Sequence, residues 1–358
     1  MKMLLNKNFP ILDNCTYLNT ANSGLLSSDI ANWRQQHDLQ FTQNGSMFRI
    51  ENIKVIDELR TNLSDSFFCK KENTFLTPNF SIGFNTILEG LGKHHRFLIL
   101  HDDYPTLSYA ITSRGFDFWE VPIDSNLEQN ILDAIEKFKP TAFAFSMVQY
   151  ISGLRMQSDF IKQLKVLFPD LILIADGTQF LGTTVFNFKN SGLDVLAGSG
   201  YKWLLGGYGN GYIFLSDDVK NKLYEGRKQS LLPTAQFISG RNYLSLSLEP
   251  GHLDSLNFGT LNQGINYINN IGLDVIEKTN QELANKARQK LHAKGLIPDW
   301  LIERKEQSSI ISLPLEKEVL LRLEAKKIIC SIRGANTRIS FHFYNTEENL
   351  NQFLEALK

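Results

Sequence analysis

The sequence has very few cysteines and no spacing of histidines that suggests a metal site. Its 358 residues include three cysteines, Cys15, Cys69 and Cys330, which lie far apart in the chain. A low, odd number of cysteines indicates a reducing compartment rather than a disulfide framework. The seven histidines form one adjacent pair and are otherwise scattered. We therefore expect neither disulfides nor a structural metal.

Long apolar runs and an excess of one charge are also missing. No stretch is long and apolar enough to span a bilayer, and the N-terminal MKMLLNKNFP has too short an apolar run for a signal peptide. The formal net charge is −1, without a basic block, so nothing indicates binding to nucleic acid or to an acidic membrane surface. These features predict a cytoplasmic protein with neither a nucleic-acid nor a membrane partner.

The order of apolar segments predicts an α/β fold with two lobes. Between residues 97 and 216, short apolar strands alternate with helices, which indicates a mainly parallel sheet covered on both faces. A loop-like stretch over 229–260 and a long helix over 261–291 should follow. The chain exceeds the size of a comfortable single core. We predict a large domain over 17–258 and a small α+β domain over 259–358, with residues 1–16 packed on the latter.

The stretch 199–211, SGYKWLLGGYGNG, contains one lysine among apolar residues and glycines. Burial beside Trp203 and Leu204 would lower the pKa of the Lys202 amine and make it reactive. Such a lysine can form a Schiff base with a carbonyl compound. The alternative is a surface lysine on a glycine-rich turn, and the lysine alone would favour that alternative.

Other polar residues fall where predicted strands end. Asp176 closes the apolar segment LILIAD, where a buried carboxylate needs a partner such as a cationic ring nitrogen. A role as a helix cap or an ion pair with a nearby lysine would explain Asp176 equally well. Gln179 is either a donor to the same ligand or an exposed turn residue. Ser81, at a predicted helix start, is either part of an anion cradle or an N-cap. Ligands of parallel sheets lie beyond the carboxyl ends of strands, so these residues, with Lys202, Tyr104 and Tyr150, could converge.

Two motifs identify a family resemblance. ADGTQFLG (175–182) and LDVLAGSGYKWLLGGYGNG (193–211) resemble the pyridoxal-phosphate signature of the class V aminotransferase family, which includes cysteine desulfurases, kynureninases and isopenicillin-N-epimerase-like enzymes. YLNTANSG, LNFGTLN and TRISFHFYNTEE extend the resemblance from about residue 17 to the C-terminus. It implies fold type I, with a mainly parallel sheet in a large domain and a smaller α+β domain, and pyridoxal 5'-phosphate as the cofactor.

The resemblance also implies roles for individual residues at the cofactor. Lys202 would hold the cofactor as a Schiff base and later carry the Cα proton of the substrate. Asp176 would pair with the pyridine nitrogen, and Gln179 would donate to the phenolic oxygen. Tyr104 would stack on the ring, unless it is a core tyrosine. The phosphate would be bound by Ser199, Tyr201, Ser81 and the backbone at Phe80.

Further implied roles concern the substrate and a second subunit. Thr260, in NFGT, would reach the phosphate of a neighbouring subunit, which implies a homodimer with shared active sites. Arg338, in TRIS, would bind the α-carboxylate of an amino acid substrate, a task suited to the guanidinium group. Asn22 and Ser23 lie in a loop that borders the substrate in this family.

The sequence departs from the cysteine desulfurase pattern. Arg333 and Gly334 lead almost directly into Asn336, so the loop that carries the nucleophilic cysteine is expected to be missing. We expect Cys330, inside the apolar IICSI, to be a core residue. The phosphate-site hydroxyl expected next to Ser81 is replaced by Phe80, and many family members have Ser-Asn where this chain has Gln149 and Tyr150.

We therefore predict a pyridoxal-phosphate enzyme that acts at the Cα of a small amino acid, with an aminotransferase as the first expectation. A lyase or an epimerase on the same cofactor is the enzymatic alternative, and desulfurase activity is disfavoured. A non-catalytic protein that keeps the cofactor and the fold is the third possibility.

Overall fold

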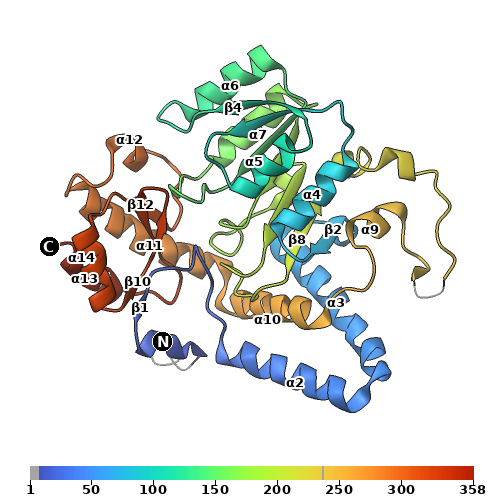
Figure 1. Ribbon diagram of the computed structural model, residues 1–358, viewed down its shortest axis with the longest axis horizontal. Helices are drawn as coiled ribbons and strands as arrows, with labels where there is room; N and C mark the ends of the chain where they lie inside the picture. Colours follow the sequence, from blue (N-terminus) through green and yellow to red (C-terminus); the bar gives the residue numbers. More distant parts are fainter. Residues whose placement is uncertain (1–7, 236–237) are drawn as a thin grey trace.

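A computed structural model describes residues 8–235 and 238–358. Its centre is a seven-stranded sheet with the order β2-β8-β7-β6-β5-β3-β4 (Figure 1). The neighbouring strands from β7 to β4 run parallel, and β8 is antiparallel to both β7 and β2. The strands are β2 (Thr74–Thr77), β3 (Arg96–Leu100), β4 (Asp117–Val121), β5 (Ala142–Ser146), β6 (Ile172–Asp176), β7 (Val195–Ser199) and β8 (Gly211–Leu215). The predicted α/β fold with a mainly parallel sheet is confirmed.

Apart from the edge strand β4, whose first four residues are exposed, the sheet is buried on both faces because its strands are mostly apolar. Successive side chains of a strand point to opposite faces, and here the side chains on each face pack in a separate hydrophobic core. Leu98 and Phe143 belong to one cluster of buried residues, whereas Phe97, Ile99 and Ala142 belong to another. This double burial explains the continuous apolar runs in the sequence.

Five of the helices of this part, α2, α4, α8, α9 and α10, begin at a residue whose side chain caps them. The side chain of Ser27 accepts a hydrogen bond from the N–H of Ile30 at the start of α2, and Asn79 caps α4 in the same way through Ile82. The helices are α2 (Ser28–Asn44), α3 (Ser46–Phe67), α4 (Phe80–Gly90), α5 (Pro105–Thr112), α6 (Leu127–Phe138), α7 (Ser158–Leu167), α8 (Asp217–Lys220), α9 (Tyr243–Leu248) and α10 (Ser255–Ile271).

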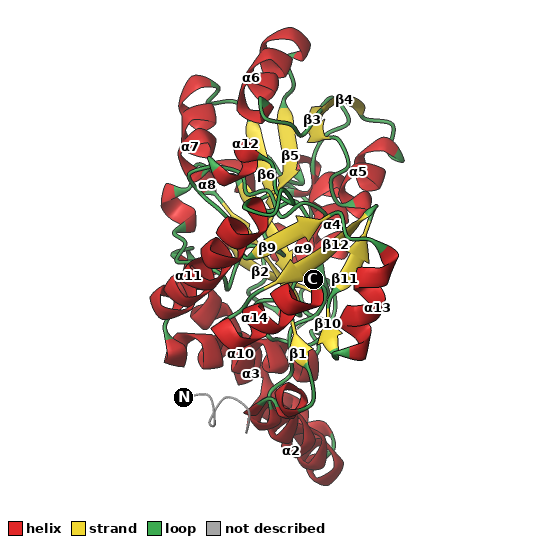
Figure 2. Cartoon of the chain, turned by 90° about the vertical axis from the view of Figure 1, so that its left-hand side faces the viewer, coloured by secondary structure: helices red, strands yellow, loops and turns green. Residues whose placement is uncertain are grey.

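The C-terminal elements form a second group beside the large sheet, with the N-terminal β1 next to them (Figure 1). A small antiparallel sheet has the order β11-β12-β9, and β1 pairs in parallel with β10. Figure 2 shows the small sheet with α13 and α14 beside it. These elements are β1 (Thr16–Tyr17), α11 (Leu273–His292), α12 (Asp299–Ile302), β9 (Ile310–Leu313), α13 (Lys317–Ala325), β10 (Ile328–Ile329), β11 (Ser331–Arg333), β12 (Asn336–Ser340) and α14 (Glu347–Ala356).

The junction of the two groups differs from the sequence-based expectation. The long helix predicted over 261–291 is two helices, α10 and α11, because Gly272 between them has φ +94°, a value that side chains with a Cβ disfavour. The helix α10 begins before residue 259, the predicted domain boundary, and packs on α3 and α2. The predicted loop 229–260 contains α9, and its residues 236–237 lie outside the described residues, as do residues 1–7 of the N-terminal segment.

Two general features of the described chain bear on function. Within residues 8–235 and 238–358, no helix has the length and apolar character needed to cross a bilayer. The same residues contain no group of three or more histidine, cysteine or acidic side chains arranged to hold a metal ion.

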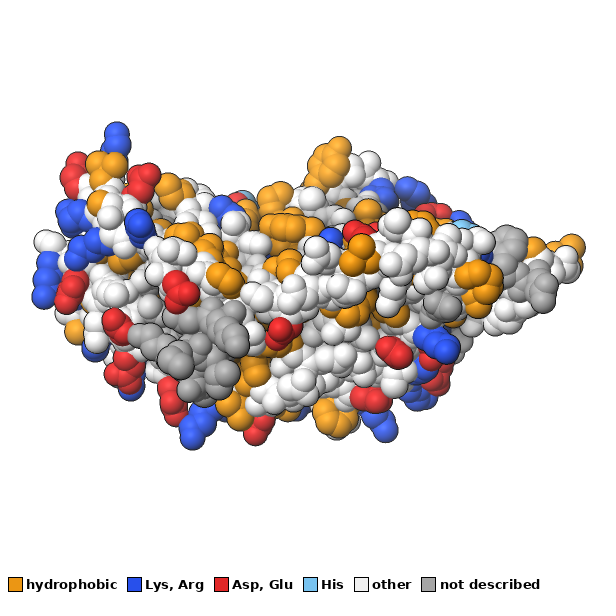
Figure 3. All heavy atoms as spheres, turned by 90° about the horizontal axis from the view of Figure 1, so that it is seen from below, with side chains coloured by type: hydrophobic (Ala, Val, Ile, Leu, Met, Phe, Trp, Pro, Cys, Tyr) orange, Lys and Arg blue, Asp and Glu red, His pale blue; other side chains and the backbone are white. Residues whose placement is uncertain are grey.

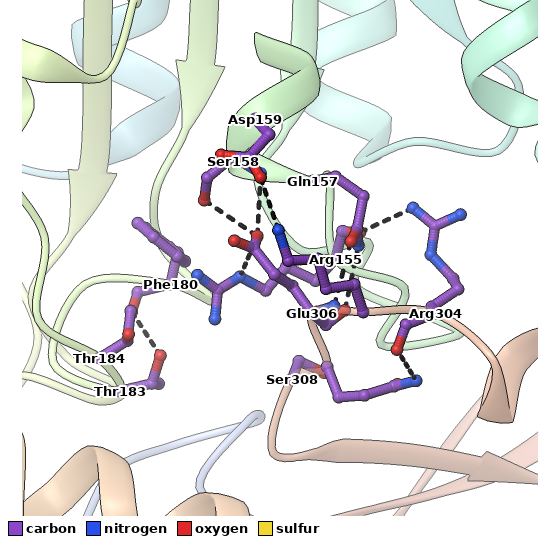
Figure 4. A network of polar contacts seen from close by, with 12 residues as sticks. Arg155, Gln157, Ser158, Asp159, Phe180, Thr183, Thr184, Arg304, Glu306 and Ser308 are labelled. Carbon is purple, nitrogen blue, oxygen red and sulfur yellow. Dashed lines mark hydrogen bonds and ion pairs between the residues drawn. The ribbon is translucent and has the colours of Figure 1, made fainter. Parts of the chain in front are cut away.

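A polar network joins the loop that follows β5 to the segment that precedes β9 (Figure 4). The Glu306 carboxylate accepts hydrogen bonds from the N–H and the hydroxyl of Ser158, both at 2.9 Å, and lies 3.5 Å from Nε of Arg155. Arg304 pairs with Glu128 at 2.5 Å. The side chain of Arg155 is 10% exposed and that of Glu306 is 23% exposed. This mostly buried network links the segment before β9 of the small sheet to the loop after β5 of the large sheet, and so holds the two sheets together.

We predict that Glu306→Ala destabilises the protein by about 3 kcal/mol, because it leaves the buried guanidinium of Arg155 without its counter-charge. Urea unfolding measures the change. Lys305→Ala is the matched control, since it removes the adjacent but exposed pair with Asp159 and should cost less than about 1 kcal/mol. Equal losses for the two variants would contradict the assignment.

Candidate active site

A cavity of about 350 Å³ opens at the carboxyl ends of β5, β6 and β7. The strand register places the last residues of β5 and β6, Ser146 and Asp176, side by side. Ligands of open α/β sheets bind at this edge. The lining residues are Asn79, Phe80, Ser81, Ile82, Tyr104, Ser146, Val148, Tyr150, Asp176, Thr178, Gln179, Ser199, Tyr201 and Lys202.

A larger cavity of about 590 Å³ lies at the opposite edge, where β3, β5 and β6 begin. Its walls include His94, His95, Asp170 and Arg227, and none of the residues predicted to act on a cofactor. We place the functional site in the smaller cavity, because convergent polar groups rather than volume mark a binding site.

Lys202 follows β7 and is 8% exposed. Burial lowers the pKa of its amine to about 7, the charge of Arg338 acts in the same direction, and Asp176 opposes both. A substantial share of the amine is therefore unprotonated near neutral pH, as a nucleophile or a base requires. The predicted surface-lysine alternative does not fit this placement.

The glycines after Lys202 serve packing against α10. A Cβ at Gly206 would lie 2.7 Å from Leu261, and one at Gly209 would lie 2.8 Å from the side-chain amide of Asn257. No glycine lines the cavity. From the other side, a Cβ at Gly24 would lie 1.9 Å from the carbonyl oxygen of Lys202. Close backbone contacts thus hold the turn that carries Lys202.

Asp176 ends β6 and is 6% exposed. One carboxylate oxygen accepts a hydrogen bond of 2.8 Å from the N–H of Thr178. Burial raises the pKa of Asp176 to about 7, while Thr178 and Lys202 favour the charged form. No lysine or arginine of the described chain lies within ion-pair distance of it, so a cationic ligand atom would supply the missing partner.

Hydrogen-bond donors gather at the start of α4, on one wall of the cavity. The N–H of Phe80 donates to the hydroxyl of Ser199 at 2.9 Å. The hydroxyl of Ser81 lies 2.9 Å from that of Thr106. The first N–H groups of a helix attract anions. Tyr201 borders the same cavity, and its ring stacks on Tyr208 with centroids 4.7 Å apart.

Gln179 and Tyr104 also line the cavity. The Gln179 amide donates to the carbonyl of Ala21 and accepts from the indole N–H of Trp203, both at 2.8 Å. One N–H of the amide is then left for a ligand. The half-buried Tyr104 ring packs against one core cluster and lies edge-on to Tyr150, with ring centroids 5.6 Å apart.

Arg338 and Asn22 do not line the cavity but lie next to it. Arg338 is 2% exposed, and its Nη1 donates to the carbonyl of Tyr150. Its Nε and Nη2 are buried without a partner. Asn22 accepts a hydrogen bond of 2.5 Å from Nη2 of Arg333.

Thr260 lies away from the cavity, in the second turn of α10. Its side chain is 0% exposed, donates to the carbonyl of Leu256 at 2.7 Å and accepts from Arg34 at 2.7 Å. The sequence reasoning placed it in a loop that reaches another subunit. Here its stretch is helical and packed on α2, and its contact with the phosphate of a second subunit stays a prediction.

None of the described cysteines lines the cavity. Cys330 lies between β10 and β11, where burial raises the pKa of its thiol, and it packs on the core of the small sheet. The strands β11 and β12 are joined by only two residues, Gly334 and Ala335. This tight turn leaves no room for a long cysteine-bearing loop.

Sequence reasoning missed several residues of the cavity wall. Ser146 ends the strand next to Asp176, and its hydroxyl donates to buried Asp103 at 2.5 Å. The hydroxyl of Thr178 accepts from the N–H of Ser199 at 3.1 Å. Asn79 caps α4 beside the cavity. Strand-end position and the turn sequence TPNF could have indicated Ser146 and Asn79.

The donor set fits pyridoxal phosphate. An aldehyde needs an unprotonated amine, which Lys202 provides. A protonated ring nitrogen suits the unpaired buried carboxylate of Asp176. A phosphate needs hydroxyls and N–H groups, which are present at Ser199, Ser81 and the start of α4.

Comparison with known proteins agrees with this chemistry. The family model described as aminotransferase class V matches residues 40–353. A probable cysteine desulfurase of Ureaplasma parvum is 22% identical, over 87% of this chain and 84% of the relative. A probable cysteine desulfurase of Borreliella burgdorferi is 25% identical, but that match spans only 50% of the relative. The uncharacterized aminotransferase YcbU of Bacillus subtilis is 20% identical, over 98% of this chain and 95% of the relative.

Solved structures share the fold over nearly the whole chain. The cystine C-S lyase C-DES, in complex with its product cysteine persulfide, has a TM-score of 0.86, 17% identity and 98% coverage of both chains. An apo cysteine desulfurase from Thermococcus onnurineus has a TM-score of 0.82 and 18% identity, over 98% of this chain and 95% of that one. In a C-DES variant with a TM-score of 0.86, glycine is covalently linked to the PLP cofactor.

We predict that pyridoxal phosphate attaches to the cofactor-free protein at a rate that rises with pH and levels off above about pH 7. The unprotonated amine reacts, and burial makes this form available below the ordinary lysine pKa of about 10.4. Asp176→Asn should shift the midpoint to lower pH, and Arg338→Gln to higher pH, since the two charges act in opposite directions on Lys202. Stopped-flow absorbance measures the rate. A wild-type midpoint near pH 10 would contradict the burial argument.

Proposed function

Because the chain belongs to the class V aminotransferase family, whose cofactor is pyridoxal 5'-phosphate, we propose that it is an aminotransferase acting at the Cα of a small α-amino acid. One observation carries the proposal: a buried amine of lowered pKa, Lys202, shares a cavity with the unpaired carboxylate of Asp176 and lies near the unpaired guanidinium donors of Arg338. The cavity is at the small end of the usual range of ligand sites, about 300–1,000 Å³, which favours a small substrate.

Each residue has a defined task in this proposal. The bound cofactor supplies an electron sink for the negative charge that develops at Cα. Asp176 keeps the ring nitrogen protonated, because a buried carboxylate held by Thr178 is stabilised by a cation. Ser199, Ser81 and the N–H groups of α4 would hold the phosphate.

Lys202 and Arg338 act on the substrate. Lys202 would take the proton from the Cα of the substrate, since its lowered pKa lets the amine act as a base near neutral pH. Arg338 binds the α-carboxylate through its two unpaired N–H donors. This contact would orient the Cα–H bond toward the lysine. Tyr104, Tyr150 and Val148 form part of the cavity wall.

Desulfurase activity is disfavoured by the site itself. That reaction needs a nucleophilic thiol near the substrate, and no cysteine of the described residues lines the cavity. The two-residue turn between β11 and β12 stands where a cysteine-bearing loop is needed. Relatives described as probable cysteine desulfurases fit a shared cofactor chemistry, and we propose on the grounds of the site that this chain catalyses a different reaction.

A lyase is the second candidate, and the absence of a thiol from the described cavity favours it over a desulfurase. Elimination from the β-carbon needs the same lysine and carboxylate-binding arginine without a nucleophilic cysteine. The fold is similar to that of C-DES, which is described as a cystine C-S lyase. An epimerase and a non-catalytic cofactor-binding protein remain the further alternatives, and the products distinguish all of them.

We also propose that the protein is a cytoplasmic homodimer. Apolar side chains of α2 and α3 are exposed, and Figure 3 shows hydrophobic side chains interspersed over the face that α2 forms. Such an exposed group fits burial against a second copy. The exposed residues are Leu39, Phe41, Met47, Ile50 and Ile53. Sharing of the active sites through Thr260 stays a prediction.

We predict that one or more small amino acids convert the bound cofactor to its amine form, with release of the matching 2-oxo acid. Lys202→Ala should slow this conversion by about 10²–10⁴-fold, the usual contribution of a general base. A screen of amino donors by absorbance, with mass spectrometry of the products, measures both. Pyruvate and ammonia without the amine form would identify a lyase. No product from any donor would contradict both enzymatic assignments.

A further inference from the structure

Two arginine side chains lie on one face of the small sheet, next to the cavity. Arg338 of β12 stands opposite Ser331 of β11, and Arg333 follows two residues later, so both arginines point to the same face. Diagonal neighbours of this kind are about 7–8 Å apart. Within the described part of the chain, neither arginine forms an ion pair, and their known partners are uncharged oxygens.

The surroundings of Arg338 are polar and incompletely satisfied. Its Nε and Nη2 are buried without partners. Ser331 and Ser312 stand on either side of it across the sheet, and both hydroxyl oxygens are also buried without a partner. Buried donors without acceptors cost free energy, so this group of residues fits a bound anion. The proposed function assigns the α-carboxylate of the substrate to this place.

Arg333 lies between the N-terminal loop around Asn22 and the segment that follows Tyr150. Its Nη2 donates to Asn22 at 2.5 Å, in the N-terminal loop that reaches Lys202 through Gly24. The turn after Arg333 approaches the other segment, since a Cβ at Gly334 would lie 3.8 Å from Ile151, the residue after Tyr150.

The positive charges of Arg333, Arg338 and Lys202 repel one another. Arg333 lowers the pKa of both Arg338 and Lys202, which places its charge close enough to act on each of them. A single carboxylate at Arg338 would leave the charge of Arg333 uncompensated. Each guanidinium can bind a carboxylate through two parallel N–H groups.

We infer that the substrate carries a second anionic group on its side chain, bound by Arg333 while Arg338 binds the α-carboxylate. This inference rests on the proposed function and narrows it to acidic amino acids and their 2-oxo acids. Arg333 then determines specificity. The alternative is that Arg333 only anchors the N-terminal loop through Asn22, and the test separates the two.

The test compares succinate with butyrate, which have the same number of carbons and differ by one carboxylate. Calorimetric titration of the holoenzyme should show succinate binding about tenfold or more tightly, the contribution of one charge-assisted hydrogen bond. Arg333→Gln should remove this preference and leave butyrate binding unchanged. Arg338→Gln should weaken both ligands. Equal binding of the two ligands by the wild type would overturn the inference.

Asn22→Ala is the matched control, because it removes the partner of Arg333 and keeps the charge. The preference for succinate should then persist within about threefold, less than one charge-assisted hydrogen bond. A loss as large as that of Arg333→Gln would show that Arg333 only anchors the loop, and would overturn the inference. If Arg333→Gln fails to fold, Arg333→Lys is the substitute. It keeps the positive charge but lacks the two parallel N–H groups of the guanidinium, so it should retain part of the preference for succinate over butyrate. A folded Arg333→Lys protein that keeps the full preference of the wild type would overturn bidentate binding by Arg333.

Measuring conversion of the cofactor by amino donors separates the aminotransferase proposal from the inference of an acidic substrate. If a donor converts the cofactor but succinate and butyrate bind equally, the substrate inference fails and the aminotransferase assignment stands. If succinate is preferred through Arg333 but no donor reacts, the anion site stands and the proposed reaction fails.

Discussion

The site depends on charged groups that are held away from water before a ligand binds. Lys202 and Asp176 are both nearly buried, and each is shifted toward its neutral form by desolvation. Arg338 is buried with two donors unpaired. Such groups are costly in an empty protein, and a ligand with a cationic ring nitrogen and a carboxylate would satisfy them. A ligand that pairs with these groups would therefore offset the free energy that their desolvation costs.

The fold maintains this arrangement through three separate segments. Parallel strands bring Asp176 and the turn of Lys202 to one edge of the sheet. The N-terminal loop packs on the Lys202 carbonyl at Gly24, which has no room for a Cβ. The small sheet contributes Arg338, and the network around Glu306 fixes that sheet against the large one. The geometry of the site is therefore a property of both lobes together.

The sequence could predict the positions of residues that follow from a local pattern. The apolar strands and the polar residues at their ends are readable as a pattern, so the convergence of Lys202 and Asp176 could be predicted. The environment of Thr260 could not, because a helix start was not visible ahead of NFGT and the contact with α2 is tertiary. The packing of the glycines on α10 and the pairing of Arg155 with Glu306 also join distant segments. Such contacts leave no periodic signal in the sequence.

The most direct test of the central claim is the position of the covalent link to the cofactor. Borohydride reduction of the purified protein, followed by peptide mass spectrometry, locates the pyridoxyl group on a single residue. The account predicts stoichiometric labelling of the peptide that contains Lys202, because this amine is the one made reactive by burial in the cavity. Labelling of another lysine, or no labelling of a protein reconstituted with pyridoxal phosphate, would contradict it.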